Sequence, residues 1–262
     1  MVLLEFSNVT KRFGGLTAVN DLSFEVMQHR IHALIGPNGS GKSTSINLIN
    51  GSFPVTSGTI RFDGTDITKM PMHDIARLGL GRTFQNLKLF HSLTVEENLL
   101  VGLYQKSNVN ILKFIVDFRS SSQEEQMMRE KANVMMKYIG IEQYANTLVG
   151  SLPYGRQKMT ELARTMMIEP KLILLDEPAA GLNPTERREF IDLIQRIFES
   201  GVTILMIEHN MDVIMKICES ITVINFGSKI AEGTPDEIQN DPNVIKAYLG
   251  DRYQAIHDGG GN

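Results

Sequence analysis

The sequence is short of several residue types, and each shortage excludes a class of protein. One cysteine, Cys218, among 262 residues allows no internal disulfide, so we expect a small buried side chain and a reducing compartment. No uncharged apolar run reaches the roughly 18 residues that a membrane-spanning helix needs. The opening residues meet a charge at Glu5, which argues against a cleavable signal. We therefore expect a soluble protein that reaches a membrane only through a partner.

An excess of positive charge is also lacking. Lysine and arginine total 26 against 30 aspartates and glutamates, which gives a formal net charge of −4. A protein that binds nucleic acid through a broad basic face would carry the opposite balance. We therefore expect no nucleic-acid partner.

Hydrophobic patterns that are present indicate a mixed α/β fold. Residues 22–26 and 58–64 alternate apolar and polar side chains, which predicts half-buried strands. The apolar runs 32–36, 172–178 and 202–209 predict buried strands, and the helix-like stretch 185–200 separates the last two. This order is typical of a parallel sheet covered on both faces.

Residues 86–168 follow a different pattern. Methionine, glutamate and lysine recur there at helical spacing, which predicts a separate helical lobe. Residues 221–233 predict a closing hairpin, and the glycine-rich end of the chain, residues 257–262, is expected to fray.

A glycine-rich turn joins one predicted strand to a helix. Residues 36–43 fit the pattern G-x-x-x-x-G-K-[ST], in which inward-pointing N–H groups and the helix N-terminus receive phosphate oxygens. Lys42 is expected to reach the β- and γ-phosphates, and Ser43 to bind Mg²⁺. The residues predicted to bind nucleotide in this turn are Gly36, Pro37, Asn38, Gly39, Ser40, Gly41, Lys42, Ser43 and Thr44.

Two carboxylates follow the apolar run 172–175. Ligands bind at the carboxyl ends of strands in open α/β sheets, so Asp176 is predicted to complete the Mg²⁺ shell. Glu177 is predicted to act as general base toward the attacking water. His209, just after the run 202–207, is predicted to contact the γ-phosphate and Glu177. Phosphoryl transfer needs these parts together.

The order of these motifs along nearly the whole chain resembles the nucleotide-binding subunits of ABC transporters. The resemblance implies a RecA-like P-loop fold with an antiparallel β subdomain, formed by residues 1–85 and 169–262, and a helical subdomain at 86–168. It implies ATP and Mg²⁺ as cofactors and ATP hydrolysis as the activity. Gln85 resembles the Q-loop glutamine, which touches Mg²⁺ or the water, and Phe13 is placed like the aromatic that stacks on adenine.

The family's signature and D-loop have recognisable counterparts. Asn183 lies in the D-loop counterpart, where aspartate is common. The signature, usually written LSGGQ, corresponds to Leu152, Pro153, Tyr154, Gly155 and Arg156. Pro153 stands where the family has a serine, so the serine hydroxyl that contacts the γ-phosphate is absent. The Gly155 N–H and the N-terminus of the next helix are still expected to donate hydrogen bonds to an anionic oxygen. Arg156 replaces the usual glutamine and is expected to add positive charge.

The resemblance also implies partners. In this family the phosphate site of one subunit is completed by the signature of a second, homologous or identical, and hydrolysis pulls on membrane permeases. Finer similarity, including residues 81–102 and 242–250, is to branched-chain amino acid importers, which use a solute-binding protein. We therefore expect a peripheral protein on the cytoplasmic membrane face of a bacterium or archaeon. The apolar stretch 110–118 is expected to pack on the helical lobe; the alternatives are that it grips the permease or inserts into lipid.

Other functions stay open beside this one. Urea and amide importers share much of the same sequence in these stretches. A soluble ABC ATPase of DNA repair or translation would need a basic surface or a second cassette, and neither is visible. A P-loop GTPase would carry an N-K-x-D motif, which is absent. A non-catalytic assembly protein would have no use for Glu177 and His209.

Overall fold

The computed structural model describes residues 1–83, 87–104 and 123–248. Compact packing divides these residues into two units. Unit 1 holds residues 1–75, 174–177 and the chain from 203 onward, and unit 2 holds residues 76–173 and 178–202.

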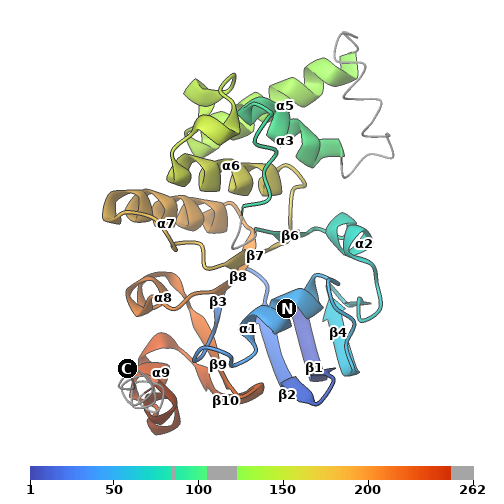
Figure 1. Ribbon diagram of the computed structural model, residues 1–262, viewed down its shortest axis with the longest axis vertical. Helices are drawn as coiled ribbons and strands as arrows, with labels where there is room; N and C mark the ends of the chain where they lie inside the picture. The colour runs from blue at the N-terminus through green and yellow to red at the C-terminus, as the bar shows by residue number, and fades with distance from the viewer. Residues whose placement is uncertain (84–86, 105–122, 249–262) are drawn as a thin grey trace, which may run out of the picture. The chain divides into compact units, whose positions relative to one another are not determined.

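An antiparallel sheet forms the first part of unit 1 (Figure 1). Strands β1 (Val2–Phe13) and β2 (Leu16–Met27) pair as a hairpin, in which Phe13 lies opposite Leu16. Strand β4 (Ser57–Phe62) pairs with the other edge of β1, and β5 (Thr65–Asp66) follows it. The alternation along residues 22–26 places Leu22 and Val26 in the core, as predicted for a half-buried strand.

The central sheet of unit 1 contains the buried strands. The full sheet has six strands in the order β10 (Ser228–Gly233), β9 (Ser220–Asn225), β3 (Ile31–Ile35), β8 (Thr203–Ile207), β7 (Leu172–Asp176) and β6 (Leu80–Arg82). Strand β6 and the first two residues of β7 are counted with unit 2. Strand β3 runs parallel to both β8 and β9, and β9 and β10 form the predicted antiparallel hairpin. All five residues of β3, β7 and β8 are buried, which agrees with their unbroken apolar sequences.

Helices of unit 1 follow these strands. Helix α1 (Lys42–Ile49) begins after β3, α8 (Met211–Ile217) after β8, and α9 (Pro235–Asn240) after β10. Helix α2 (Met72–Arg77) runs from unit 1 into unit 2. Cys218, predicted to be a small buried residue, is buried.

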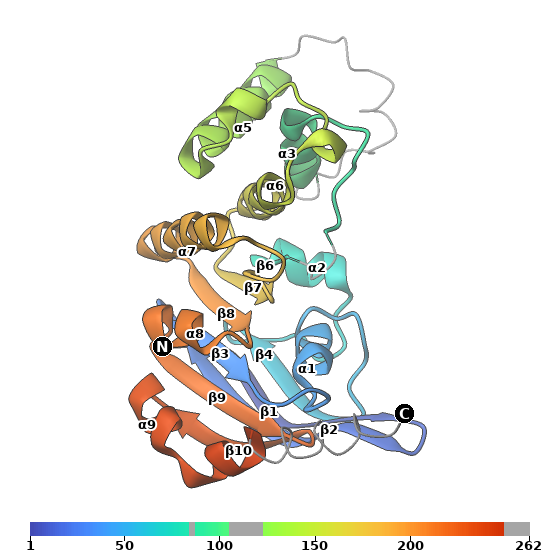
Figure 2. The same cartoon turned by 60° about the vertical axis from the view of Figure 1, so that its left-hand side comes forward.

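Unit 2 consists mainly of helices. Helices α3 (Val95–Tyr104), α5 (Gln123–Ile139) and α6 (Tyr154–Met166) lie side by side in both ribbon views (Figures 1 and 2). Two 3₁₀ turns, Glu142–Tyr144 and Val149–Ser151, connect α5 to α6. Strand β6 (Leu80–Arg82) and helix α7 (Pro184–Glu199) complete the unit.

The predicted α/β class is therefore confirmed, with a partly parallel sheet, an antiparallel sheet and a group of helices. The division into residues 1–85, 86–168 and 169–262 stays a prediction. Within the described residues, no helix is long and apolar enough to cross a membrane. The apolar stretch 110–118 and the chain end 257–262 lie outside the described residues.

Candidate active site

The glycine-rich turn lies between β3 and α1, where the sequence predicts it. Gly41 is the N-cap of α1 and has φ +105°, a conformation that side-chain-bearing residues rarely adopt. A Cβ atom at Gly41 would lie 2.5 Å from the Ala18 carbonyl oxygen, and one at Gly36 would collide with the Ile224 carbonyl. Glycine is therefore required at both positions to close the turn.

Donor groups gather at this turn. Helix α1 has no side-chain cap and no acidic residue in its first turn, so the positive end of the helix faces the turn without a competing carboxylate. The Lys42 ammonium donates to the carbonyl oxygens of Gly36, at 2.7 Å, and Pro37, at 2.8 Å. It lies 3.5 Å from the hydroxyl of Ser40. The arrangement fits the binding of an anionic group.

The hairpin β9–β10 supports the turn from outside. The N–H of Gly227, in the hairpin loop, donates to the Ser40 carbonyl at 2.9 Å. The Gly227 carbonyl in turn accepts from the Asn20 N–H at 2.9 Å. Sequence reasoning missed this support, because Gly227 is far from the motif along the chain.

The remaining predicted residues of the turn differ in exposure. Ser43 and Asn38 are exposed, Thr44 is half-buried, and Ser40 is buried. The exposed Ser43 hydroxyl at the start of α1 is accessible to a ligand. The complete set lies in one stretch of backbone: Gly36, Pro37, Asn38, Gly39, Ser40, Gly41, Lys42, Ser43 and Thr44.

The two predicted carboxylates lie at the end of β7. Asp176 is the last residue of that strand and is buried. Glu177 follows with φ +49°, a conformation that costs energy for a residue with a side chain. Its N–H donates to the Ile207 carbonyl at the end of β8, at 2.9 Å. The ends of β7 and β8 are thus adjacent, as the sequence predicts.

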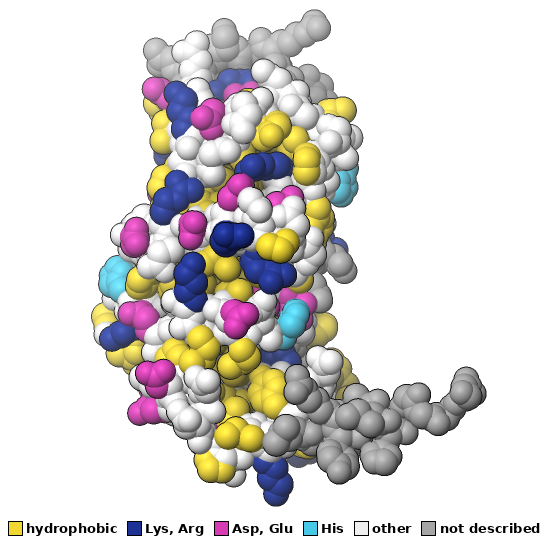
Figure 3. All heavy atoms as spheres, turned by 90° about the vertical axis from the view of Figure 1, so that its left-hand side faces the viewer, with side chains coloured by type: hydrophobic (Ala, Val, Ile, Leu, Met, Phe, Trp, Pro, Cys, Tyr) yellow, Lys and Arg dark blue, Asp and Glu magenta, His cyan; other side chains and the backbone are white. Residues whose placement is uncertain are grey.

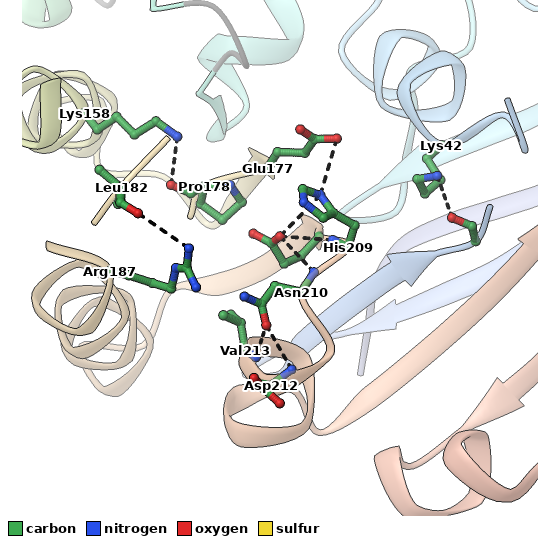
Figure 4. A network of polar contacts seen from close by, with 12 residues as sticks. Lys42, Lys158, Glu177, Pro178, Leu182, Arg187, His209, Asn210, Asp212 and Val213 are labelled. Atoms are coloured by element: carbon green, nitrogen blue, oxygen red, sulfur yellow. Dashed lines mark hydrogen bonds and ion pairs between the residues drawn. The ribbon is translucent and has the colours of Figure 1, made fainter. Parts of the chain in front are cut away.

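His209 meets Glu177 at these strand ends. The His209 Nδ1 atom lies 3.8 Å from Glu177 Oε1 and 3.6 Å from Glu208 Oε1 (Figure 4). The His209 side chain is largely exposed, whereas the Glu177 side chain is mostly covered. This contact was expected from the sequence.

Glu208 is a residue of the site that sequence reasoning missed. Its carboxylate is buried and accepts from the backbone N–H groups of His209, at 3.0 Å, and Asn210, at 3.1 Å. The Asn210 side chain then caps α8 by accepting from the Asp212 and Val213 N–H groups. The turn that carries His209 is therefore fixed on both sides. The sequence signal for it was an acidic residue directly before the predicted histidine.

The predicted signature lies in unit 2, at the start of α6. Pro153 is the N-cap of α6, and Leu152 before it is buried. The Tyr154 ring lies against Gly181, so that a Cβ there would come within 2.9 Å of the ring. A Cβ at Gly155 would lie 2.9 Å from the Glu186 carboxyl group. Only glycine fits at that position without movement of Glu186.

Arg156 is engaged within the same unit. Its guanidinium forms an ion pair with Glu189 of α7, with an N–O distance of 3.2 Å. Lys158, which is buried, donates to the Pro178 carbonyl at 2.9 Å (Figure 4). These contacts fasten the start of α6 to the chain around α7.

Asn183 is the N-cap of α7. Its side chain accepts from the Thr185 and Glu186 N–H groups, and the Glu186 carboxylate accepts from the Asn183 N–H. The side-chain oxygen is thus used for capping. A role for Asn183 in nucleotide binding stays a prediction.

Phe13 and Gln85 are the two remaining predicted site residues. Phe13 lies at the end of β1 and is half-exposed, as a stacking residue must be. Gln85 lies outside the described residues. The structure thus brings together Glu177 and His209, and, at the glycine turn, Lys42 with Gly36 and Pro37.

A strand, a glycine-rich turn with lysine and a helix, together with carboxylates at a neighbouring strand end, define a P-loop nucleoside triphosphatase. The comparisons with known proteins specify the family. Residues 19–180 match the ABC transporter family, and residues 228–254 match a family described as branched-chain amino acid ATP-binding cassette transporter.

Curated relatives cover almost the whole chain. The high-affinity branched-chain amino acid transport ATP-binding protein BraF of Pseudomonas aeruginosa is 44% identical over 95% of this chain and 98% of its own. The corresponding protein LivG of Escherichia coli K12 is 40% identical with the same coverage. A crystal structure of the ADP conformation of an ATP-binding cassette of an ABC transporter has a TM-score of 0.84. It is 31% identical and covers 95% of this chain and 99% of its own. The chain belongs to the ABC transporter family and is an ATP-hydrolysing, ATP-binding cassette of it.

Proposed function

We propose that this cassette hydrolyses Mg-ATP together with a second cassette and drives import of branched-chain amino acids through membrane permeases. The observation that carries the catalytic part is the contact of His209 with Glu177 at the adjacent ends of β7 and β8. Both residues and the Lys42 turn belong to unit 1.

The glycine turn is suited to hold the triphosphate. The uncapped N-terminus of α1 supplies oriented N–H dipoles, and Lys42 supplies a full positive charge beside them. The carbonyl groups of Gly36 and Pro37 hold the ammonium at the turn, so little rearrangement is needed when a phosphate oxygen arrives.

Ser43 and Asp176 are the proposed Mg²⁺ ligands. A hydroxyl and a carboxylate are the hard oxygen donors that Mg²⁺ prefers, and the ion commonly takes its other ligands from phosphates and water. Among the described residues, no group of three or more acidic, histidine or cysteine side chains could hold a metal ion by itself. When bound, Mg²⁺ neutralises charge on the phosphates. Gln85 is proposed to contact the ion or the water.

Glu177 is the proposed general base. Its carboxylate would accept a hydrogen bond from the attacking water and orient that water in line with the leaving group. His209 lies 3.8 Å from Glu177, where it can orient the Glu177 side chain, and it is proposed to donate to a γ-phosphate oxygen. Glu208 positions the histidine by accepting its backbone N–H.

A second cassette is proposed to complete the site with its own residues 152–156. Gly155 and the N-terminus of α6 would donate to the γ-phosphate of the partner's nucleotide. The signature proline removes a hydroxyl but leaves these backbone donors. We propose that the partner is an identical or a related cassette.

The transported solute is inferred from similarity. The match at residues 228–254 and the names of the two curated relatives favour branched-chain amino acids over urea or amides. We place the cassette on the cytoplasmic membrane face of a bacterium or archaeon, bound to permeases that receive solute from a binding protein. On the face shown in Figure 3, basic and acidic side chains are interspersed, which gives no support to a nucleic-acid partner.

A transport assay tests the proposal. Cells that lack the gene should lose uptake of labelled leucine, and the wild-type gene should restore it. Glu177→Gln should fail to restore uptake although the protein accumulates normally. Restored uptake of urea or an amide, with leucine uptake unaffected throughout, would contradict the assignment of the solute.

A further inference from the structure

A lysine lies beside the half-exposed ring that is placed for adenine. The Lys11 ammonium lies over the Phe13 ring, 4.8 Å from its centroid, and 5.9 Å from the centroid of the Phe53 ring. The two rings meet edge to face, with centroids 5.5 Å apart. All three residues belong to unit 1.

The lysine is fixed in this place. Lys11 is only 8% exposed, and its ammonium donates to the Pro54 carbonyl at 2.7 Å. Burial of a lysine is unfavourable unless its charge finds partners, and here a carbonyl and two aromatic rings provide them. The ammonium therefore holds a defined position beside Phe13.

Backbone contacts strengthen the same connection. The Thr56 N–H donates to the Thr10 carbonyl at 2.8 Å, and the Thr56 hydroxyl accepts from the Arg12 N–H at 3.0 Å. The end of β1 is thus tied to the segment 53–56. That segment follows α1 directly, and the Phe53 N–H donates to the Asn47 carbonyl in α1 at 3.1 Å.

The rings of Phe13 and Phe53 stay partly exposed although these contacts hold them in place. Phe13 is 42% exposed and Phe53 is 37% exposed. A cation over an aromatic ring attracts the ring electrons toward itself and blocks that face. Phe13 keeps exposed surface, and stacking of an electron-rich planar group on the ring would cover this apolar surface.

We propose that Lys11 and Phe53 are positioning residues that hold Phe13 for the adenine base of ATP. Lys11 acts by its charge on one face of the ring and by its bond to Pro54, and Phe53 acts by edge contact. The proposal rests on the proposed ATP binding at the Lys42 turn. It makes the segment 53–56 a rigid link between the base site and the helix that carries Lys42.

Binding of ATP and of inorganic tripolyphosphate to the purified full-length chain separates this role from a general structural one. Tripolyphosphate carries the charge of the nucleotide without the base. Lys11→Met removes the charge and the donor at similar length, and Lys11→Arg keeps both. Lys69→Met is the matched control, because Lys69 is an exposed lysine of the same unit.

Calorimetry should give the following results. Lys11→Met weakens ATP binding about threefold to thirtyfold, the range of a cation–π contact, and leaves tripolyphosphate binding unchanged. Lys11→Arg recovers most of the loss, and Lys69→Met binds both ligands as wild type. In the background of Phe13→Ala, which itself weakens ATP binding, Lys11→Met has little additional effect, because it acts through the ring.

Three outcomes overturn the inference. They are unchanged ATP affinity in Lys11→Met, an equal loss of tripolyphosphate affinity, and full additivity with Phe13→Ala. Failure of the wild-type chain to bind ATP contradicts the proposed function instead. Thermal melting of each variant establishes that a loss of binding does not reflect unfolding.

Discussion

Glu177 Oε1 and His209 Nδ1 lie 3.8 Å apart at the adjacent ends of strands β7 and β8. The Glu177 backbone adopts φ +49°, and its N–H donates to the Ile207 carbonyl two residues before His209. A strained backbone held by a hydrogen bond is typical of a functional position. The pair therefore supports a shared role in catalysis.

Replacement of His209 by alanine should slow hydrolysis without abolishing ATP binding. The histidine is expected to orient Glu177 and to donate to the nucleotide in the transition state, so kcat should fall about 10²-fold or more. KM for ATP should change little. Phosphate release measured over a range of ATP concentrations provides both values. His73→Ala is the control, since His73 is exposed and is not one of the predicted site residues. An unchanged kcat in His209→Ala would contradict the role.

Replacement of Glu208 by alanine should affect both stability and turnover. The buried carboxylate accepts two backbone N–H groups, and their loss of a partner should lower the free energy of unfolding by about 1–3 kcal/mol. Turnover should fall as well, because His209 loses its fixed position. Glu208→Gln keeps an acceptor oxygen and should lose less in both respects. Urea unfolding and phosphate release test this, and equal losses in the two variants would argue against the hydrogen-bonding explanation.

Replacement of Arg156 should have less effect on nucleotide binding than the sequence suggests. Added positive charge at the signature was expected, but the guanidinium is paired with Glu189 of α7. Both partners are partly exposed, so a double-mutant cycle should give a coupling of about 0–1 kcal/mol. Arg156→Gln and Glu189→Gln should both leave KM for ATP near the wild-type value. A higher KM in Arg156→Gln alone would indicate that the arginine contacts phosphate.

His32 should make stability depend on pH. Burial, with a smaller effect of the Lys229 charge, lowers the pKa of His32 from 6.5 to about 4, and its ring contacts the hydroxyls of Ser220 and Thr222. Between these pKa values the unfolded chain binds more protons than the folded one, so this contribution to stability is complete above about pH 6.5 and decreases on acidification. At pH 5 the loss should be about 2 kcal/mol relative to pH 7.5.

A comparison of wild type with His32→Gln isolates this effect from other titrating groups. Denaturant unfolding at pH 7.5 and pH 5 should show a smaller loss on acidification in the variant, because glutamine does not titrate. The same loss in both proteins would show that His32 is not the cause.

The sequence predicted the parts of the site that depend on local chain geometry. A strand followed by Gly36, Gly41 and Lys42 allows few conformations, so the sequence alone predicts the glycine-rich turn. The carboxylates Asp176 and Glu177 were readable because they end an unbroken apolar run. The adjacency of Glu177 and His209 followed from the rule that parallel strands end at the same edge of a sheet.

Contacts made by tertiary packing were not readable. Lys11 and Pro54 are 43 residues apart, and nothing in the local pattern around Lys11 indicates that its side chain is buried. The pairing of Arg156 with Glu189 depends on how α6 packs on α7. The support of the turn by Gly227 depends on the placement of the β9–β10 hairpin. Hydrophobic periodicity carries no information on such partners.

Hydrolysis by Glu177→Gln, measured together with nucleotide binding, tests the central claim most directly. The account predicts that this variant binds ATP in the presence of Mg²⁺ as wild type does, releases no phosphate above background, and accumulates as an ATP-bound dimer in size-exclusion chromatography. Phosphate release at the wild-type rate by Glu177→Gln would contradict it.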